Sequence, residues 1–449
     1  MKHTSDKLMR VAELARGDRK LKFTSLAHLI NEQTLTACYG LLKKRKASGV
    51  DGVTVEEYAG KNCKELGPKV KALVERMKTK TYQPQPVRRV YIPKPGKQEM
   101  RPLGIPAVED KLVQIALKEI LEAIYGQDFL DCSHGFRPKR SCHTAINRLD
   151  KVVMQKPINH VVEVDIAKFF DNVSHYWLLR CLEERIKDPN LLELIRKFLK
   201  AGMMEEGRWS ASDEGTPQGG VVSPVLANIY LHYVLDLWFE ASFKPKSKGY
   251  VELIRYCDDF VVACESRKDA ESFLEALRQR LSQFGLKVSE EKTQIVRFGR
   301  KAWQESKGNG PKKWKSFNFL GFTHYCSTSR KGKFIMGHKT SKVNMARKLK
   351  EINVWLKQVR SQIELRTWWP ILQAKVTGHY AYFGISGNMR CLQQFQKAVS
   401  KLAFKWINRR SQKKSMSLEN YFQYLQPKFP TPRIYYDLYT LSPERSVPC

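Results

Sequence analysis

Two adjacent aspartates, Asp258 and Asp259, lie between two apolar runs in the segment LIRYCDDFVVA, residues 253–263. This pattern is typical of a β-hairpin with the acids at its tip, although a lone Asp pair is more often an ordinary turn. A third carboxylate, Asp165, ends another apolar run in VVEVDIAKFFDNV. If the two segments are neighbouring strands, three carboxylates converge. Like charges that close repel one another unless a cation lies among them.

Oxygen ligands of this kind select Mg²⁺, and Mn²⁺ can substitute for it. Two such ions about 4 Å apart lower the pKa of an attacking hydroxyl and stabilise the leaving oxygen of an in-line phosphoryl displacement. The aspartates therefore predict polymerase-type chemistry with two bound cations.

Periodicity and turn residues predict the elements that position these acids. Residues 87–92 and 101–105 are typical of the two strands of a basic flap, 110–125 of a helix and 161–166 of a buried strand. After Gly321 the pattern changes to helices with basic faces. We expect their apolar stripes to pack in the core of a separate helical domain. The stripes are Ala346, Leu349, Ile352, Leu356 and Val359, then Leu392, Phe395, Val399, Leu402 and Trp406.

The composition favours a polyanionic partner. The 449 residues include 79 Lys and Arg against 45 acidic residues, a formal net charge of +34. Charge alone does not separate nucleic acid from a ribosomal or membrane-surface partner. No run approaches the length of a membrane span, and the first residues lack the apolar core of a signal peptide, so we expect a cytoplasmic protein without membrane contact. The ten cysteines show no CxxC spacing, which favours reduced, buried thiols.

Seven segments, in this order, resemble the reverse transcriptase family. They are RPLGIP (101–106), SHGFRPKRSCHTA (133–145), VDIAKFFDNV (164–173), GTPQGGVVSPVLANIYL (215–231), RYCDDFV (255–261), GLKVSEEKT (285–293) and FLGF (319–322).

Within that family the chain is similar to the group II intron enzymes. SGVDGVT (48–54) resembles their N-terminal extension loop, and the helical region from about Lys342 resembles their thumb, the maturase or X domain. The resemblance implies an α+β right-hand polymerase with fingers, an antiparallel palm sheet and a helical thumb. The implied divisions are 1–90 (N-terminal extension and start of the fingers), 91–335 (fingers and palm), 336–410 (thumb) and 411–449 (a basic C-terminal segment).

The same resemblance assigns catalytic roles to particular residues. Asp165 and Asp258 become metal ligands with Asp259 beside them, and the main-chain carbonyl of Ile166 becomes a further ligand. Lys292 matches a lysine that protonates the departing pyrophosphate, although a surface turn lysine is an equal alternative.

Residues implied to bind the incoming nucleotide are Lys94, Arg101, Phe170, Gln218 and Gly219. The two basic side chains would hold the triphosphate, or else be solvated surface charges. Gln218 would contact the nucleotide, with Gly219 allowing close backbone approach. The Phe170 ring would lie under the sugar and exclude a 2′-hydroxyl, whereas Phe169 packs in the core.

Phe136 and Arg137 in SHGFRP are expected either to position template and fingers or to be structural. The sequence departs from the family in two places. The hairpin reads YCDD where intron enzymes usually have YADD, so Cys257 slightly enlarges the side chain beside the metal site. The chain ends at Cys449, with little sequence after the thumb for DNA-binding and nuclease domains, so we do not expect cleavage of target DNA.

These features predict an RNA-directed DNA polymerase that uses dNTPs to extend a primer on an RNA template. The first hypothesis is an intron-encoded enzyme that binds its group II intron RNA, promotes splicing and makes the DNA copy in retrohoming. The second is a free-standing relative in DNA repair or phage defence. The third is a splicing maturase without polymerase activity, which the intact aspartates and Gln218 argue against.

Overall fold

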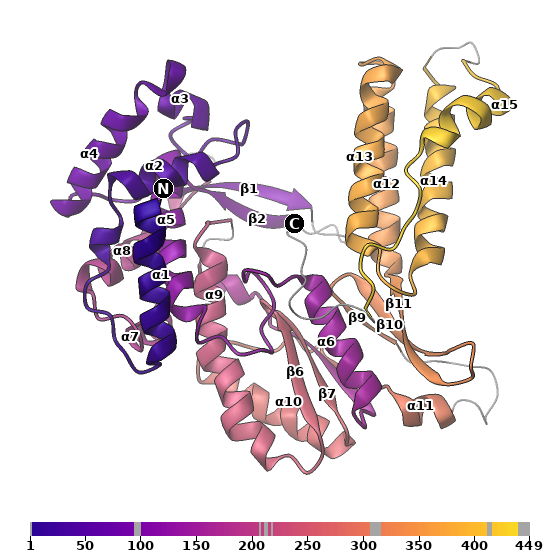
Figure 1. The fold of residues 1–449 in the computed structure, drawn as a ribbon, viewed down its shortest axis with the longest axis horizontal. Coiled ribbons are helices and arrows are strands. Elements are labelled where there is room, and N and C mark those ends of the chain that lie inside the picture. Colours follow the sequence, from indigo (N-terminus) through magenta and orange to yellow (C-terminus); the bar gives the residue numbers. More distant parts are fainter. Residues whose placement is uncertain are drawn as a thin grey trace.

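A computed structural model describes residues 2–93, 100–205, 208–210, 214–216, 219–305, 316–410 and 415–438. Long helices α12 to α14 (within residues 342–407) stand together on one side, and helices α1 to α4 (within residues 2–78) lie on the other (Figure 1). The flap of strands β1 (residues 87–93) and β2 (residues 100–105) points from the N-terminal helices toward α12 to α14, the thumb helices (Figure 1). Within the described ranges, no helix is long and apolar enough to cross a bilayer.

The N-terminal helices are α1 (Lys2–Gly17), α2 (Glu32–Leu41), α3 (Val55–Ala59) and α4 (Leu66–Lys78). Two of them begin at side-chain caps. Thr54 and Glu57 form a capping box at the start of α3, and Asn31 caps α2 by accepting from the Thr34 amide.

The predicted flap is confirmed. Strand β1 (Val87–Pro93) pairs antiparallel with β2 (Met100–Ile105), and β1 also pairs with the short strand β4 (Met203–Glu205). Strand β5 (Arg208–Ser210) completes the sheet in the order β2-β1-β4-β5. Arg88 ties the sheet to the N-terminal loop, since its guanidinium donates to the Ser48 carbonyl at 2.7 Å.

A four-stranded antiparallel sheet forms the palm, in the order β6-β7-β3-β8. Strand β3 (His160–Asp165) lies between β7 (Asp259–Cys264) and β8 (Gln294–Arg297), and β6 (Val251–Tyr256) forms one edge. The two aspartate-bearing segments are therefore neighbouring strands, as the apolar runs predicted. Burial of both hairpin strands explains why their sequences are almost continuously apolar.

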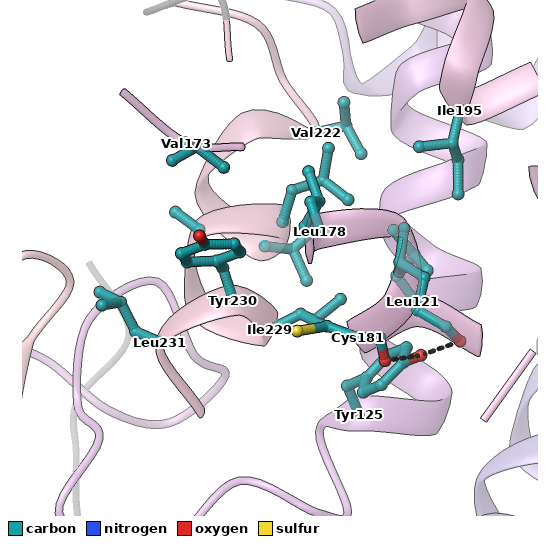
Figure 2. Close-up of a cluster of buried hydrophobic side chains, with 14 of the residues drawn as sticks. Leu121, Tyr125, Val173, Leu178, Cys181, Ile195, Val222, Ile229, Tyr230 and Leu231 are labelled. Atoms are coloured by element: carbon teal, nitrogen blue, oxygen red, sulfur yellow. Dashed lines mark hydrogen bonds between the residues drawn. The ribbon is translucent and has the colours of Figure 1, made fainter. Parts of the chain in front are cut away.

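Helices pack around this sheet and form the main core. They are α5 (Val108–Tyr125), α6 (Cys142–Gln155), α7 (His175–Glu183), α8 (Pro189–Lys200), α9 (Ser223–Leu231) and α10 (Arg267–Ser282). Figure 2 shows Leu178 and Cys181 beside Ile229, with Tyr125 below them. The buried Tyr125 hydroxyl donates to the Leu182 carbonyl at 2.7 Å, so the core leaves this polar group satisfied.

The expectation of helices directly after Gly321 is wrong. A three-stranded antiparallel sheet spans this region: β9 (Ser316–Phe319), β10 (Phe322–Thr328) and β11 (Phe334–Thr340). Burial alternates along β10 with a period of two, which is typical of a strand. The prediction from helical periodicity did not include this alternation. The short helix α11 (Arg300–Glu305) precedes this sheet.

A buried chain of polar groups fastens this sheet to the palm. His338 Nε2 lies 3.1 Å from Asp150 Oδ1 in α6, and His338 Nδ1 lies 2.9 Å from His324 Nδ1. All three side chains are buried. The sheet therefore belongs structurally to the palm side, with the thumb helices following it.

The thumb contains α12 (Lys342–Val359), α13 (Leu365–Phe383), α14 (Met389–Ile407) and the short α15 (Leu418–Asn420). Both predicted stripes lie in its separate hydrophobic core, except that Ala346 is exposed and the first stripe begins at Leu349. Helix α13 was not predicted, because Pro370 lies inside it and proline usually interrupts a helix.

Candidate active site

Strand pairing brings the carboxylates together. Asp165 lies directly opposite Asp259 in the register of β3 and β7, so the two side chains project from the same face of the sheet. Asp258 occupies the two-residue turn between β6 and β7, immediately before Asp259. The other turn residue, Cys257, has a positive φ of 58° and a buried side chain.

The carbonyl of Ile166 is directed toward this hairpin. The Ala167 amide donates to the Lys287 carbonyl at 2.9 Å, and the Ser289 amide donates to the Asp165 carbonyl at 2.8 Å. These bonds bracket Ile166 opposite Val288. In antiparallel pairing, a residue between such bonds directs its own N–H and C=O to the opposite side, which here is the side of β7.

The carboxylates of this cluster repel one another. The pKa of Asp259 is raised to about 7, first because burial disfavours its charge and then because Asp258, Glu163 and Asp165 repel it. Glu163 was missed by the sequence reasoning. Its position two residues before Asp165 in a strand places it on the same face, which was the available signal. Burial also raises the pKa of Glu163, and its carboxylate accepts from Gln294 Nε2 at 2.8 Å.

Lys292 supplies a positive charge at this point. Its Nζ lies 2.5 Å from Asp165 Oδ2, although the two residues are far apart in the chain. Their side chains are 51% and 39% exposed, so substrate or a cation can reach both. The family resemblance placed Lys292 among the catalytic residues, and the fold brings it to them.

A cleft of about 620 Å³ opens beside the acids. Its lining includes Asp165, Asp259 and Lys292 from the palm, together with Lys339 and Lys342. Lys339 lies near the end of β11, and Lys342 begins α12. The cleft is thus shaped by both the palm and the thumb, and it is lined by acidic and basic residues.

Phe169 and Phe170 differ in exposure, although Phe170 packs against the edge of the core that contains Phe169. Phe169 is buried in the main core, as predicted, whereas Phe170 is partly exposed and lines a cavity of about 190 Å³. The two rings meet edge to face at 5.3 Å. Gly104 and Gly215 line the same cavity, so Phe170 lies between the flap and the palm.

Gly215 and Gly219 lie close to neighbouring backbone. A Cβ on Gly215 would meet the main-chain oxygens of Phe170 and Asp171 at 2.8 Å. A Cβ on Gly219 would meet the Gly104 carbonyl at 2.5 Å, and Gly219 has a φ of 109°. Gly219 therefore lies close to the backbone of strand β2 of the flap, whereas the approach to a nucleotide expected at this glycine stays a prediction.

All five predicted nucleotide contacts remain predictions. Lys94 and Gln218 lie outside the described residues. Arg101 stands opposite Ile92 in the β1–β2 register, and its backbone is described but not its side chain.

Phe136 and Arg137 differ in whether their side chains can contact a ligand. Phe136 is 53% exposed and contacts the Tyr256 ring at 6.1 Å, so it is available to a ligand. Arg137 instead donates to the Leu130 and Ser133 carbonyls at 2.7 and 2.9 Å. Its guanidinium is occupied in shaping the loop, which supports the structural alternative.

The site has oxygen donors suited to hard divalent cations. Within the described ranges, no three His, Cys, Asp or Glu side chains stand in a closed arrangement around one metal position. The crowded carboxylates and the raised pKa of Asp259 nevertheless fit a site that cations complete, and the Lys292 ammonium supplies positive charge at Asp165.

A palm sheet with paired aspartates, a basic flap and a helical thumb define a polymerase-like fold. A family model for reverse transcriptase (RNA-dependent DNA polymerase) matches residues 92–324, more than half of the chain. The chain therefore belongs to the reverse transcriptase family, and the predicted α+β right-hand fold is confirmed.

The relatives include intron-encoded proteins. The chain is 41% identical over 242 residues to the group II intron-encoded protein LtrA of Lactococcus lactis subsp. cremoris, covering 53% of this chain and 39% of that one. It is 33% identical over 307 residues to protein YkfC of Escherichia coli (61% and 78%). It is 31% identical over 325 residues to the putative COX1/OXI3 intron 2 protein of Saccharomyces cerevisiae (72% and 34%). The match spans about two fifths of LtrA, and the predicted likeness to group II intron proteins is confirmed.

Proposed function

We propose that this protein is an RNA-directed DNA polymerase that extends a primer on an RNA template with dNTPs. The observation that carries this proposal is the meeting of Asp165, Asp258 and Asp259 at the end of two paired strands, within a chain of the reverse transcriptase family. The adjoining cleft, lined by basic residues as well as the acids, has the mixture of charges expected for a primer end next to a catalytic centre.

We infer that Mg²⁺, with Mn²⁺ as a substitute, binds Asp165, Asp258 and the carbonyl of Ile166, with Asp259 adjoining. The cations, when bound, would supply activation of the primer 3′-hydroxyl and charge stabilisation of the leaving pyrophosphate. The family, the oxygen-donor set and the mutual repulsion at Asp259 support this assignment.

The protein's own residues would position the nucleotide. Phe170 would exclude a 2′-hydroxyl by its ring, Arg101 and Lys94 of the flap would hold the triphosphate, and Gln218 would contact the incoming nucleotide. Lys292 would donate a proton to the pyrophosphate, and its reach to the acid cluster supports this role.

The RNA partner proposed is a group II intron RNA, bound for splicing as well as for copying. The intron-encoded relatives and the net charge of +34 support this choice. A free-standing role in repair or defence uses the same chemistry and differs in whether an intron RNA flanks the coding sequence. The proposed site of action is the cytoplasm.

Primer extension tests the proposal. Purified protein with Mg²⁺, a primed RNA template and dNTPs is expected to make DNA, and Asp258→Ala is expected to abolish synthesis while keeping RNA affinity. Glu275→Ala, which removes an exposed carboxylate on α10, is the matched control and is expected to leave synthesis intact. Full activity in Asp258→Ala would contradict the metal assignment, and RNA binding without synthesis by the unmodified protein would favour the maturase alternative.

A further inference from the structure

Arg255 lies three residues before Asp258 and is completely buried. Its guanidinium uses all three nitrogens as donors. The acceptors are Asp236 Oδ1 (2.7 Å) and Oδ2 (2.5 Å), Asn228 Oδ1 (2.9 Å), the Cys257 carbonyl (3.0 Å) and Ser133 Oγ (2.9 Å). Asp236 is equally buried, so the ion pair is shielded from solvent.

These acceptors belong to three different parts of the polymerase. Asn228 lies in α9, and Asp236 ends the π-helical turn that continues it. Cys257 lies in the turn of the catalytic hairpin, and Ser133 in the loop SHGFRP. One side chain therefore joins a core helix, the catalytic turn and the loop that exposes Phe136.

The bond to the Cys257 carbonyl acts directly on the backbone of Asp258. A peptide unit is planar, so the Cys257 carbonyl and the Cα of Asp258 move as one body. Fixing that carbonyl fixes the orientation from which the Asp258 carboxylate projects. The restraint matters here because Cys257 holds a positive φ of 58°, which residues other than glycine rarely adopt.

The loop and the hairpin are also joined through their backbones. The His134 amide donates to the Arg255 carbonyl, and the Arg255 amide donates to the Cys132 carbonyl, both at 2.8 Å. A Cβ on Gly135 would meet the Cys257 nitrogen at 2.6 Å, so the loop lies directly on the turn.

Asn228 completes the connection from the helix side. Its Nδ2 donates to the Gly135 carbonyl at 2.7 Å while its Oδ1 accepts from Arg255. The loop is thus held both by Arg255 directly and by an amide that Arg255 orients.

We propose that Arg255 is a positioning residue for nucleotide addition. It fixes the position of Asp258 relative to the loop bearing Phe136. The metal-ligating carboxylate and the template side of the site therefore keep a constant distance and orientation. This inference rests on the proposed polymerase function. Lysine cannot replace it, because an ammonium has no planar fork to reach Asp236, Cys257 and Ser133 together.

A purely structural buried ion pair is the competing explanation, and the chain offers a matched control. Arg185 is 2% exposed and donates to Asp128 at 2.9 Å and to the carbonyls of Ala15 and Arg19 at 3.0 and 2.7 Å. It anchors the N-terminal helix and contacts no residue of the candidate active site through these bonds. Arg185→Lys therefore reports what removal of a buried arginine does to stability alone.

The experiment compares Arg255→Lys with Arg185→Lys in the full-length protein. Thermal midpoints are measured first, and single-nucleotide primer extension on an RNA template is then followed well below both midpoints. Arg255→Lys is expected to lower kcat by about tenfold or more, since small misplacements of reacting groups have large rate effects. The KM for dNTP should change little and the half-saturating Mg²⁺ concentration should rise, whereas Arg185→Lys should keep kcat and the Mg²⁺ requirement near those of the unmodified protein.

Two milder variants keep the test decisive if Arg255→Lys does not fold. Ser133→Ala and Asn228→Ala each remove one acceptor of Arg255 without leaving the Asp236 charge unpaired. Both are expected to lower kcat clearly while changing the thermal midpoint little. Unchanged kcat and Mg²⁺ dependence in the folded variants would overturn the positioning role while leaving the polymerase proposal intact. Absence of synthesis by the unmodified protein would instead contradict the proposed function itself.

Discussion

At the scale of single residues, two adjacent phenylalanines differ in burial. Phe169 and Phe170 are adjacent and identical, yet one is buried in the core and the other lines a cavity next to Gly104 and Gly215. The short 3-10 turn Phe169–Asp171 produces this difference, because successive side chains in such a turn point in different directions.

Phe170→Val is expected to admit ribonucleotides. Removing the ring opens space under the sugar, and a pocket change of this size alters discrimination by about one to two orders of magnitude. Single-nucleotide extension with matched dNTP and rNTP gives a kcat/KM for each substrate. The ratio of the dNTP value to the rNTP value should fall in the variant while DNA synthesis persists.

Phe169→Val is the matched control. Its reduced core packing should cost on the order of 2 kcal/mol of unfolding free energy and leave nucleotide selection unchanged. If selection changes in Phe169→Val and not in Phe170→Val, the two rings have been assigned the wrong way round.

Gly219→Ala is expected to weaken nucleotide binding. The new methyl group would press on the Gly104 carbonyl and displace the flap from the GTPQGG segment. Gly332→Ala is the control, because Gly332 also has a positive φ, 73°, but nothing lies within 4 Å of an added Cβ. Both variants should lose about 1 kcal/mol of stability from backbone strain, and only Gly219→Ala should raise the KM for dNTP. Equal KM values in the two variants would show that the flap contact is unimportant for substrate.

At the scale of elements, the strands and helices with regular hydrophobic patterns were predicted and the irregular ones were not. The flap, the helix α5 and the paired strands β3 and β7 follow directly from periodicity. The sheet β9–β11 was missed because its alternation is short and lies next to strong helical stripes, and α13 because of Pro370.

The candidate site shows the same division. Asp165, Asp258 and Lys292 were predicted because short motifs carry them. The fold pairs Asp165 with Asp259, the neighbour of Asp258, and places Lys292 against Asp165, while their catalytic roles stay predictions. Arg255, Asn228 and Asp236 were missed as a network, since nothing in a single sequence indicates which buried polar residues meet across a fold.

Helix α13 contains a residue whose burial should make the thumb sensitive to acid. His379 stacks on Phe395 at 3.6 Å, and neither ring nitrogen has a hydrogen-bond partner in the described structure. Burial, followed by repulsion from Lys348 and Arg347, lowers its pKa from 6.5 to about 3. The unfolded chain therefore binds the proton more readily between these values, and stability falls as the pH drops below about 6.5.

His379→Phe is expected to remove this penalty. The variant should be more stable than the unmodified protein, and the difference should widen between pH 7 and pH 5 by up to about 2 kcal/mol. Chemical denaturation at the two pH values measures it. A difference independent of pH would mean that His379 is already charged in the folded thumb or that the ring is hydrated.

At the scale of the whole molecule, the positive charge is expected to determine RNA affinity. Neutralising phosphates releases counterions, so log affinity should fall linearly with log salt. Some thumb cations are already engaged within the protein: Lys348 pairs with Glu351, and Arg360 lies 4.7 Å from the Trp406 ring. Exposed lysines of α12 are better probes of RNA binding.

Replacing Lys342, Lys350 and Lys357 together by Gln should reduce the salt slope by about 0.7 to 0.9 for each phosphate that the variant no longer neutralises. These three side chains are exposed along α12, beginning at the cleft. A control triple variant at Lys246, Lys268 and Lys301, which are exposed and lie outside the thumb helices, carries the same charge change. Equal slopes for both triple variants would indicate that RNA binds without using this face of the thumb.

The central position of β3 in the palm sheet has a consequence for synthesis of the protein on the ribosome. One partner, β7, begins roughly 90 residues after β3 ends, and the other, β8, follows later still. At translation rates of about 5–20 residues per second, the nascent chain carries an apolar strand with two unpaired edges for several seconds. Helices α5 and α6 are synthesised before β3, so they are the first surfaces against which its apolar side chains can pack. Slow elongation or depletion of chaperones during this interval should therefore reduce the yield of the native protein more than its final stability suggests.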